Sequence, residues 1–92
     1  MKKTWKTNKI KELVKAFLSL KKEEDMLKFL RDVCSLEELD NIASRWQAAK
    51  LLEKGMSYRD VAKKTGMSTT TVTRIAYWMK NGEGGYSKVL KK

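Results

Sequence analysis

The sequence of 92 residues predicts an all-α protein with five to six helices. Apolar residues recur at spacings of three and four, which place them on one face of a helix, and no stretch alternates as a half-buried strand does. Proline is absent, and the five glycines lie at or beyond the expected helix ends. A chain of this length is sufficient for one domain with a limited core. We expect a single domain over residues 8–92, after a flexible basic leader at residues 1–7.

Two short amphipathic helices are expected first. One apolar stripe runs from Ile10 to Leu18, and a second runs from Met26 to Cys34. The charged residues 21–25 are interpreted as the break between them. Cys34 is the sole cysteine, so the chain contains no internal disulfide. On the apolar face of the second helix, we expect it to be a buried small apolar residue rather than a reactive thiol.

A long third helix is expected to follow. Ser35 and Glu38 have the spacing of a capping box, in which each side chain bonds the backbone of the other residue. Apolar residues then recur at helical spacing until Gly55, a residue type that commonly ends helices.

Two more helices, over residues 58–64 and 69–80, have the pattern of a helix-turn-helix. Ser57 and Ser68 stand where an N-cap is needed, and Gly66 supplies a turn residue that tolerates positive φ. We expect Val61, Val72 and Ile75 to meet between the two helices. Glycines at 82, 84 and 85 end the second helix, and residues 86–90 form at most a short last turn.

The start of the second motif helix is rich in hydroxyl groups, which is typical of a surface that contacts nucleic acid. Threonine is a poor choice for helix stability alone, but its hydroxyl can bond phosphates or base edges and its methyl can touch thymine. A packing hairpin with a solvated helix start remains the alternative. The residues that we expect to contact DNA are Ser57, Arg59, Lys63, Ser68, Thr69, Thr70, Thr71, Thr73, Arg74, Tyr77 and Lys80.

The positive charge is concentrated in the half of the chain that contains the predicted helix-turn-helix. The net charge is +10, of which residues 1–46 carry +3 and residues 47–92 carry +7. Histidine is absent, and the acidic residues cluster at expected helix starts, where the helix dipole explains them without a metal site or an acid–base pair. We therefore expect no enzyme, metal or cofactor. No apolar run approaches a membrane span, so we expect no membrane partner and a cytoplasmic, nucleoid-associated protein.

The wide stripes of the leading helices predict a homodimer, since the small helix-turn-helix offers little surface to cover them. One recognition helix also reads few base pairs, which is why such domains usually act in pairs. A compact monomer is the alternative.

The chain resembles the Trp repressor superfamily over about residues 8–86. The resemblance rests on Arg45, Leu51-Leu52, Met56-Ser57-x-Arg59 and Thr71-Val72-Thr73-Arg74. The segments Leu18-Ser19-Leu20-Lys21 and Cys34-Ser35-Leu36-Glu37-Glu38 are closer to its short YerC/YecD-type branch. The resemblance implies an intertwined all-helical homodimer with two recognition helices in successive major grooves.

One departure from the family concerns its corepressor. In the Trp repressor the indole of tryptophan lies between two arginines, of which Arg74 matches the second. We expect Trp46 at the first position, Arg45 turned elsewhere by about 100°, and Ile75 in place of a glycine. Trp46 would then occupy roughly the space of a free indole, and binding of L-tryptophan is not expected.

These features predict a sequence-specific transcriptional regulator that binds double-stranded DNA, and we expect it to act as a repressor. Two other classes stay open: a basic helical RNA-binding protein, and a protein-interaction adaptor without operator specificity. Sequence-reading RNA modules usually expose stacking aromatics, and only Tyr77 and Trp78 lie close together here. A salt titration on duplex DNA separates these classes.

Overall fold

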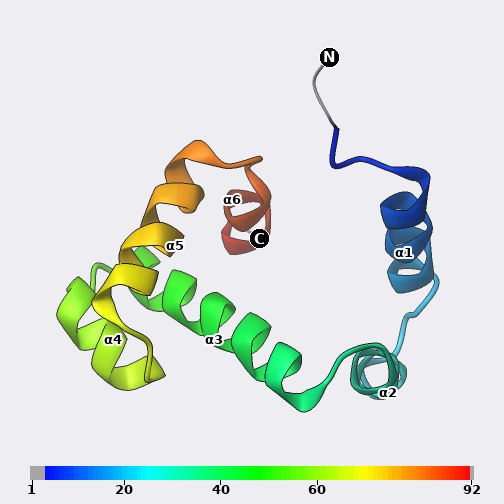
Figure 1. Cartoon of the computed structure of the whole chain (residues 1–92), viewed down its shortest axis with the longest axis horizontal. Coiled ribbons are helices and arrows are strands. Elements are labelled where there is room, and N and C mark those ends of the chain that lie inside the picture. Colours follow the sequence, from blue (N-terminus) through cyan, green and yellow to red (C-terminus); the bar gives the residue numbers. More distant parts are fainter. Residues whose placement is uncertain (1–3, 92) are drawn as a thin grey trace. The chain divides into compact units, whose positions relative to one another are not determined.

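The computed structural model describes residues 4–91, and within that range it contains six α-helices and no strand (Figure 1). The predicted all-α fold class is therefore confirmed. Contacts group the chain into a first unit up to Leu36 and a second unit from Glu37. The single domain predicted over residues 8–92 stays a prediction. Residues 1–3 of the predicted leader lie outside the described residues, and residues 4–7 are not helical.

The first unit consists of α1 (Asn8–Leu18) and α2 (Glu23–Val33). The Thr7 hydroxyl accepts a hydrogen bond from the Ile10 N–H at 3.2 Å and caps α1. Phe17 of α1 and Phe29 of α2 meet edge to face, with ring centroids 5.2 Å apart. None of the residues in these two helices is buried.

Two expectations for this unit were wrong at their boundaries. The break predicted at residues 21–25 is shorter, because α2 already begins at Glu23. Its first turn contains three acidic side chains, which the positive end of the helix dipole favours. Cys34 does not lie on the helical face: it is the C-cap residue, with extended backbone (φ −111°, ψ 149°), and is half-buried. The backbone leaves the helical conformation there because α3 begins only two residues later, at Leu36.

The second unit contains most of α3 (Leu36–Glu53), followed by α4 (Tyr58–Thr65), α5 (Thr69–Asn81) and α6 (Gly85–Leu90). These bounds confirm the predicted helix order, with ends that differ by one residue at most in the helix-turn-helix. Figure 1 shows α4 and α5 crossing at the left of the view and α6 doubling back beside α5. No helix among the described residues is long and apolar enough to cross a membrane.

The core of the second unit is small and lies where α3, α4 and α5 meet. It consists of five buried side chains: Ala48, Ala49, Val61, Val72 and Ile75. Ala48 and Ala49 are fully buried and belong to the same cluster as the buried side chains of the motif helices. Half-buried residues surround this core, among them Met67 from the turn between α4 and α5. The core therefore holds the helix-turn-helix against α3.

Candidate nucleic-acid interface

Each motif helix begins with a serine cap, as its sequence predicts. The Ser57 Oγ accepts a hydrogen bond from the Asp60 N–H at 3.1 Å, and the Ser68 Oγ accepts one from the Thr71 N–H at 3.1 Å. Each bond satisfies a backbone donor that has no partner inside its helix. The two caps fix where α4 and α5 start, and hence which residues stand in the first turn of α5.

The turn between the helices depends on the backbone of Gly66. Its φ of +75° and ψ of 9° are left-handed, a conformation that side chains with a Cβ rarely adopt. No atom lies within 4 Å of the place where a Cβ would be, so the requirement for glycine is conformational. The Thr65 hydroxyl supports the turn by donating to the Val61 carbonyl at 2.8 Å and accepting from the Met67 N–H at 3.3 Å.

The two faces of α5 are distinct. Val72 is fully buried and Ile75 is 5% exposed, so these residues fix one face against the core, together with Val61 of α4. With 100° between successive residues, Thr69, Thr73 and Tyr77 lie on the opposite face. All three are exposed, as the sequence predicts. The wedge of Val61, Val72 and Ile75 is thereby confirmed.

The predicted contact residues are nearly all exposed, with one exception. Thr71 is half-buried, and its hydroxyl lies 3.0 Å from the Ser68 hydroxyl. It takes part in the cap rather than standing on the free face. Thr73 is exposed, but its hydroxyl donates to the Thr69 carbonyl at 2.9 Å, which leaves its lone pairs and methyl group for a ligand. Thr70 has no side-chain hydrogen bond within residues 4–91.

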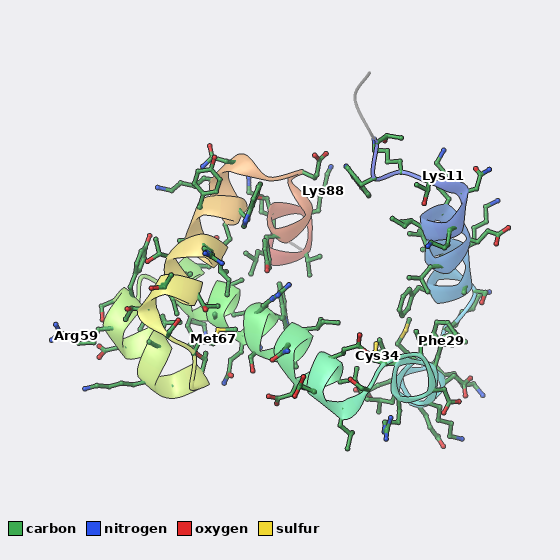
Figure 2. The ribbon with its side chains drawn as sticks, in the orientation of Figure 1. Lys11, Phe29, Cys34, Arg59, Met67 and Lys88 are labelled. Carbon is green, nitrogen blue, oxygen red and sulfur yellow. The ribbon has the colours of Figure 1, made fainter. Side chains whose placement is uncertain are left out.

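Four cations accompany this surface. Arg59 and Lys63 lie on α4, and Arg74 and Lys80 lie on α5; Figure 2 shows Arg59 directed outward from its helix. None of them forms an ion pair with a carboxylate in the described part of the chain. Their charge is thus available to phosphates.

A pocket beside α5 corrects one sequence-based expectation. Arg45 of α3 and Arg74 of α5 line the same pocket, of about 510 Å³, together with Ile75, Trp78 and Tyr86. Arg45 therefore does not point elsewhere. It precedes the buried Ala48 and Ala49 by three and four residues, so it lies on the face of α3 that packs against the motif. That spacing was the signal in the sequence.

Trp46 is not among the residues that line this pocket with the two arginines. It is half-buried and lines a neighbouring pocket of about 490 Å³ with Trp78, Tyr86 and Val89. Its ring also lies beneath the Lys50 ammonium, 5.9 Å from the ring centroid. The expectation that Trp46 fills the space between the arginines was wrong, because a step of one residue along α3 turns the indole to the adjacent side.

Two aromatic side chains near the end of α5 are strongly exposed. Tyr77 and Trp78 are each 56% exposed and meet edge to face with centroids 5.2 Å apart. Within residues 4–91, no group of three or more histidine, cysteine, aspartate or glutamate side chains is placed to bind a metal ion.

Comparison with known proteins identifies the family. A family model described as Trp repressor protein matches residues 8–92. The crystal structure of a TrpR-like protein from Eubacterium eligens has a TM-score of 0.88 and 36% identity, and the match covers 94% of this chain and 89% of that one. The uncharacterized protein YerC of Bacillus subtilis is 31% identical over 81 residues, which is 88% of this chain and 78% of YerC. A Trp operon repressor homolog of Chlamydia trachomatis is 33% identical over 82 residues, 84% of this chain and 87% of that protein.

The family match begins at the first residue of α1, so it extends over the two leading helices as well as the helix-turn-helix. The chain belongs to the Trp repressor family of DNA-binding transcription regulators.

Proposed function

We propose that this protein is a sequence-specific transcriptional regulator, acting as a repressor, that inserts α5 into the major groove of double-stranded DNA. The observation that carries this proposal is the exposed face of α5, which stands opposite the buried Val72 and Ile75. A helix fixed on one side by a core and free on the other can enter a groove as a rigid element. The protein would act in the cytoplasm, on the nucleoid.

The side chains on and beside this face can contact both the bases and the phosphates of DNA. Thr69, Thr70 and Thr73 offer hydroxyls and methyl groups to base edges, and Arg59 and Lys80 offer charge to phosphates. The start of α5 adds a further feature, since the first-turn N–H groups that the cap does not satisfy can face an anion. We assign base reading to the threonines and positioning to the cations.

We also propose that the DNA-binding form is a homodimer. In the first unit, exposed fractions reach 75% at Leu18, 61% at Leu27 and 50% at Val33. In the second unit, Ile42 and Val89 are 54% and 55% exposed. Apolar surface of this extent on a chain of this size is typical of an interface between subunits. A symmetric pair of chains would read an inverted repeat.

Selection of bound fragments from random DNA duplexes tests the proposal directly. We expect an inverted repeat whose half-sites lie about one helical turn apart. A salt titration on the selected duplex should give a line on logarithmic axes, with a slope of about −0.9 per phosphate neutralised. Recovery of no consensus, with equal affinity for unrelated duplexes, would contradict the assignment of base reading to α5.

Structured RNA is the competing ligand that a specific observation favours, because Tyr77 and Trp78 are exposed and bases stack on such rings. The same selection should therefore include a random RNA pool of equal length. Enrichment of RNA over duplex DNA, with loss of that preference in Tyr77→Ala, would support the RNA-binding function. We expect the duplex pool to be enriched instead.

A further inference from the structure

A third pocket, of about 440 Å³, lies on the second unit where the end of α3, the second half of α5 and α6 come together. Its apolar lining includes Leu52, Met79 and Leu90, one from each of these helices. The two arginines of the pocket described above do not line it, and neither do the exposed threonines of α5. The site is therefore separate from both.

The polar groups around this pocket are mainly cationic or hydroxyl-bearing. Lys80 and Lys91 contribute two ammonium groups, and Tyr58 and Ser87 contribute two hydroxyls. Glu53 is the sole carboxylate in the lining. A site with an apolar floor and a few polar groups is the usual form of a small-molecule site, and here the excess of positive charge selects an anion.

We propose that this pocket binds a small organic anion, a carboxylate with an apolar body, as an effector. The carboxylate would meet Lys91 and Lys80, and the apolar body would lie against Leu52, Met79 and Leu90. The pocket volume falls within the usual range for small ligands, about 300–1,000 Å³. Met56 and Met79 line the floor, and their flexible thioether side chains adapt to bodies of differing shape.

The position of Lys80 links this pocket to DNA. In the proposed function, Lys80 binds a phosphate, so an anion held in the pocket competes with DNA for the same ammonium. This part of the inference rests on the proposed function. Because coupling between two ligands is reciprocal, the anion weakens DNA binding and DNA weakens anion binding by the same factor. The effector would therefore release the protein from its operator.

Binding is tested on the full chain by calorimetric titration with three probes: octanoate, acetate and 1-octanol. Octanoate carries both the charge and the apolar body, whereas each of the others carries only one. We expect saturable binding of octanoate, at least about tenfold tighter than either control. Equal affinity for 1-octanol and octanoate, or the lack of saturable octanoate binding, would overturn the proposal.

Two variants, one in α6 and one at the residue that caps its end, locate the site. Lys91→Gln should weaken octanoate binding about tenfold and leave 1-octanol binding unchanged, since it removes one charge and keeps a polar side chain. Lys88→Gln is the matched control, because Lys88 is exposed three residues before Lys91 and does not line the pocket. Equal effects of the two variants would show general attraction to a basic surface and overturn the assignment.

The effect on DNA is measured separately, by titrating an operator duplex at saturating octanoate. We expect the DNA affinity to fall about fivefold, within the usual range of coupling between two sites, and the fall to disappear in Lys91→Gln. Octanoate binding with unchanged DNA affinity would overturn the regulatory role. If no duplex is bound under any condition, the proposed function fails, while the calorimetric titration still decides whether the pocket binds an anion.

Discussion

At the scale of single residues, the threonines of α5 are chemically alike but differ in what their hydroxyls do. Thr71 belongs to the cap with Ser68, and the Thr73 hydroxyl donates to its own helix, whereas the Thr70 hydroxyl has no such bond within residues 4–91. A hydroxyl already engaged in the helix offers less to a base edge than a free one. Of these three threonines, Thr70 is therefore the one that we propose to read sequence.

Two substitutions separate base reading from charge. Thr70→Ala should change which operator variants are preferred, because a contact to a base edge is lost. Lys80→Ala should weaken binding to all duplexes similarly and flatten the salt slope by about one unit. Competition binding with single-base operator variants at two salt concentrations measures both effects. Lys88→Ala, on α6, is the control for charge alone.

If α5 is the recognition helix, at least one of two threonine substitutions must change DNA binding. If Thr70→Ala and Thr73→Ala both left the preference and the affinity unchanged, α5 would not be the element that reads DNA.

At the scale of elements, the serine caps stabilise the motif helices and also determine which residues lie in the contact surface. Because the Ser68 hydroxyl satisfies the Thr71 N–H, it fixes the residue at which α5 begins. Gly66 is required in the same way for the turn, through its left-handed backbone. Element boundaries here follow from contacts between residues two to four positions apart, which is why sequence patterns predict them well.

We predict that Ser68→Ala destabilises the fold by about 1 kcal/mol, because it leaves a helix N–H without its side-chain partner. Ser68→Asp should keep the cap and restore most of that loss, since a carboxylate also accepts from the first turn. It should nevertheless weaken DNA binding, because it places a negative charge near phosphates. Urea unfolding and duplex titration of the two variants give the two measurements.

Equal stability of Ser68→Ala and the unmodified protein would mean that the cap bond contributes nothing in solution. Tighter DNA binding by Ser68→Asp would contradict the placement of Ser68 beside phosphates.

The pocket lined by Arg45 and Arg74 is the place to ask whether L-tryptophan binds. Arg45 and Arg74 both line it, contrary to the expectation from sequence that Arg45 points elsewhere. Ile75 also lines it, at the position where that repressor has glycine, and Trp78 and Tyr86 contribute aromatic walls of their own. We therefore still propose that DNA binding does not depend on L-tryptophan.

A thermal melt with and without millimolar L-tryptophan tests this proposal, paired with a duplex titration. We expect neither the melting temperature nor the DNA affinity to change. A bound ligand stabilises by mass action, by about 2.7 kcal/mol at a hundredfold excess over its dissociation constant. A raised melting temperature together with tighter DNA binding would restore the corepressor interpretation.

At the scale of the whole molecule, the apolar stripes of α1 and α2 decide the proposed assembly. These helices contain no buried residue, yet both have the spacing of a core-facing helix. Leu13 and Val14 of α1 are 41% and 48% exposed. Apolar side chains left in water at this spacing are the observation on which the proposed dimer rests.

We predict that the protein is a homodimer at micromolar concentration and that Leu13→Asp destabilises it by about 3–5 kcal/mol, because the variant buries an unpaired carboxylate. Sedimentation and urea unfolding measure the two effects. Lys9→Asp, which introduces the same carboxylate at an exposed position of α1, should leave the assembly intact. A monodisperse monomer at high concentration would refute the dimer.

The sequence by itself determined the helix order, the caps, the left-handed turn at Gly66 and the buried wedge. Each of these follows from helical periodicity or from bonds between residues close in the chain, so a linear pattern contains the needed information. The comparisons confirm the family that the motifs suggested. The individual contacts to DNA stay predictions, because they depend on a partner molecule.

Only the tertiary structure decided how α3 faces α5. A shift of one residue turns a side chain by about 100°. Because Ala48 and Ala49 are buried in the core, Arg45 lines the pocket with Arg74, and Trp46 lines the neighbouring pocket. The same holds for the pocket of Lys80 and Lys91, which joins residues from four helices. Such juxtapositions arise from the packing of distant segments, whose relative register no local pattern encodes.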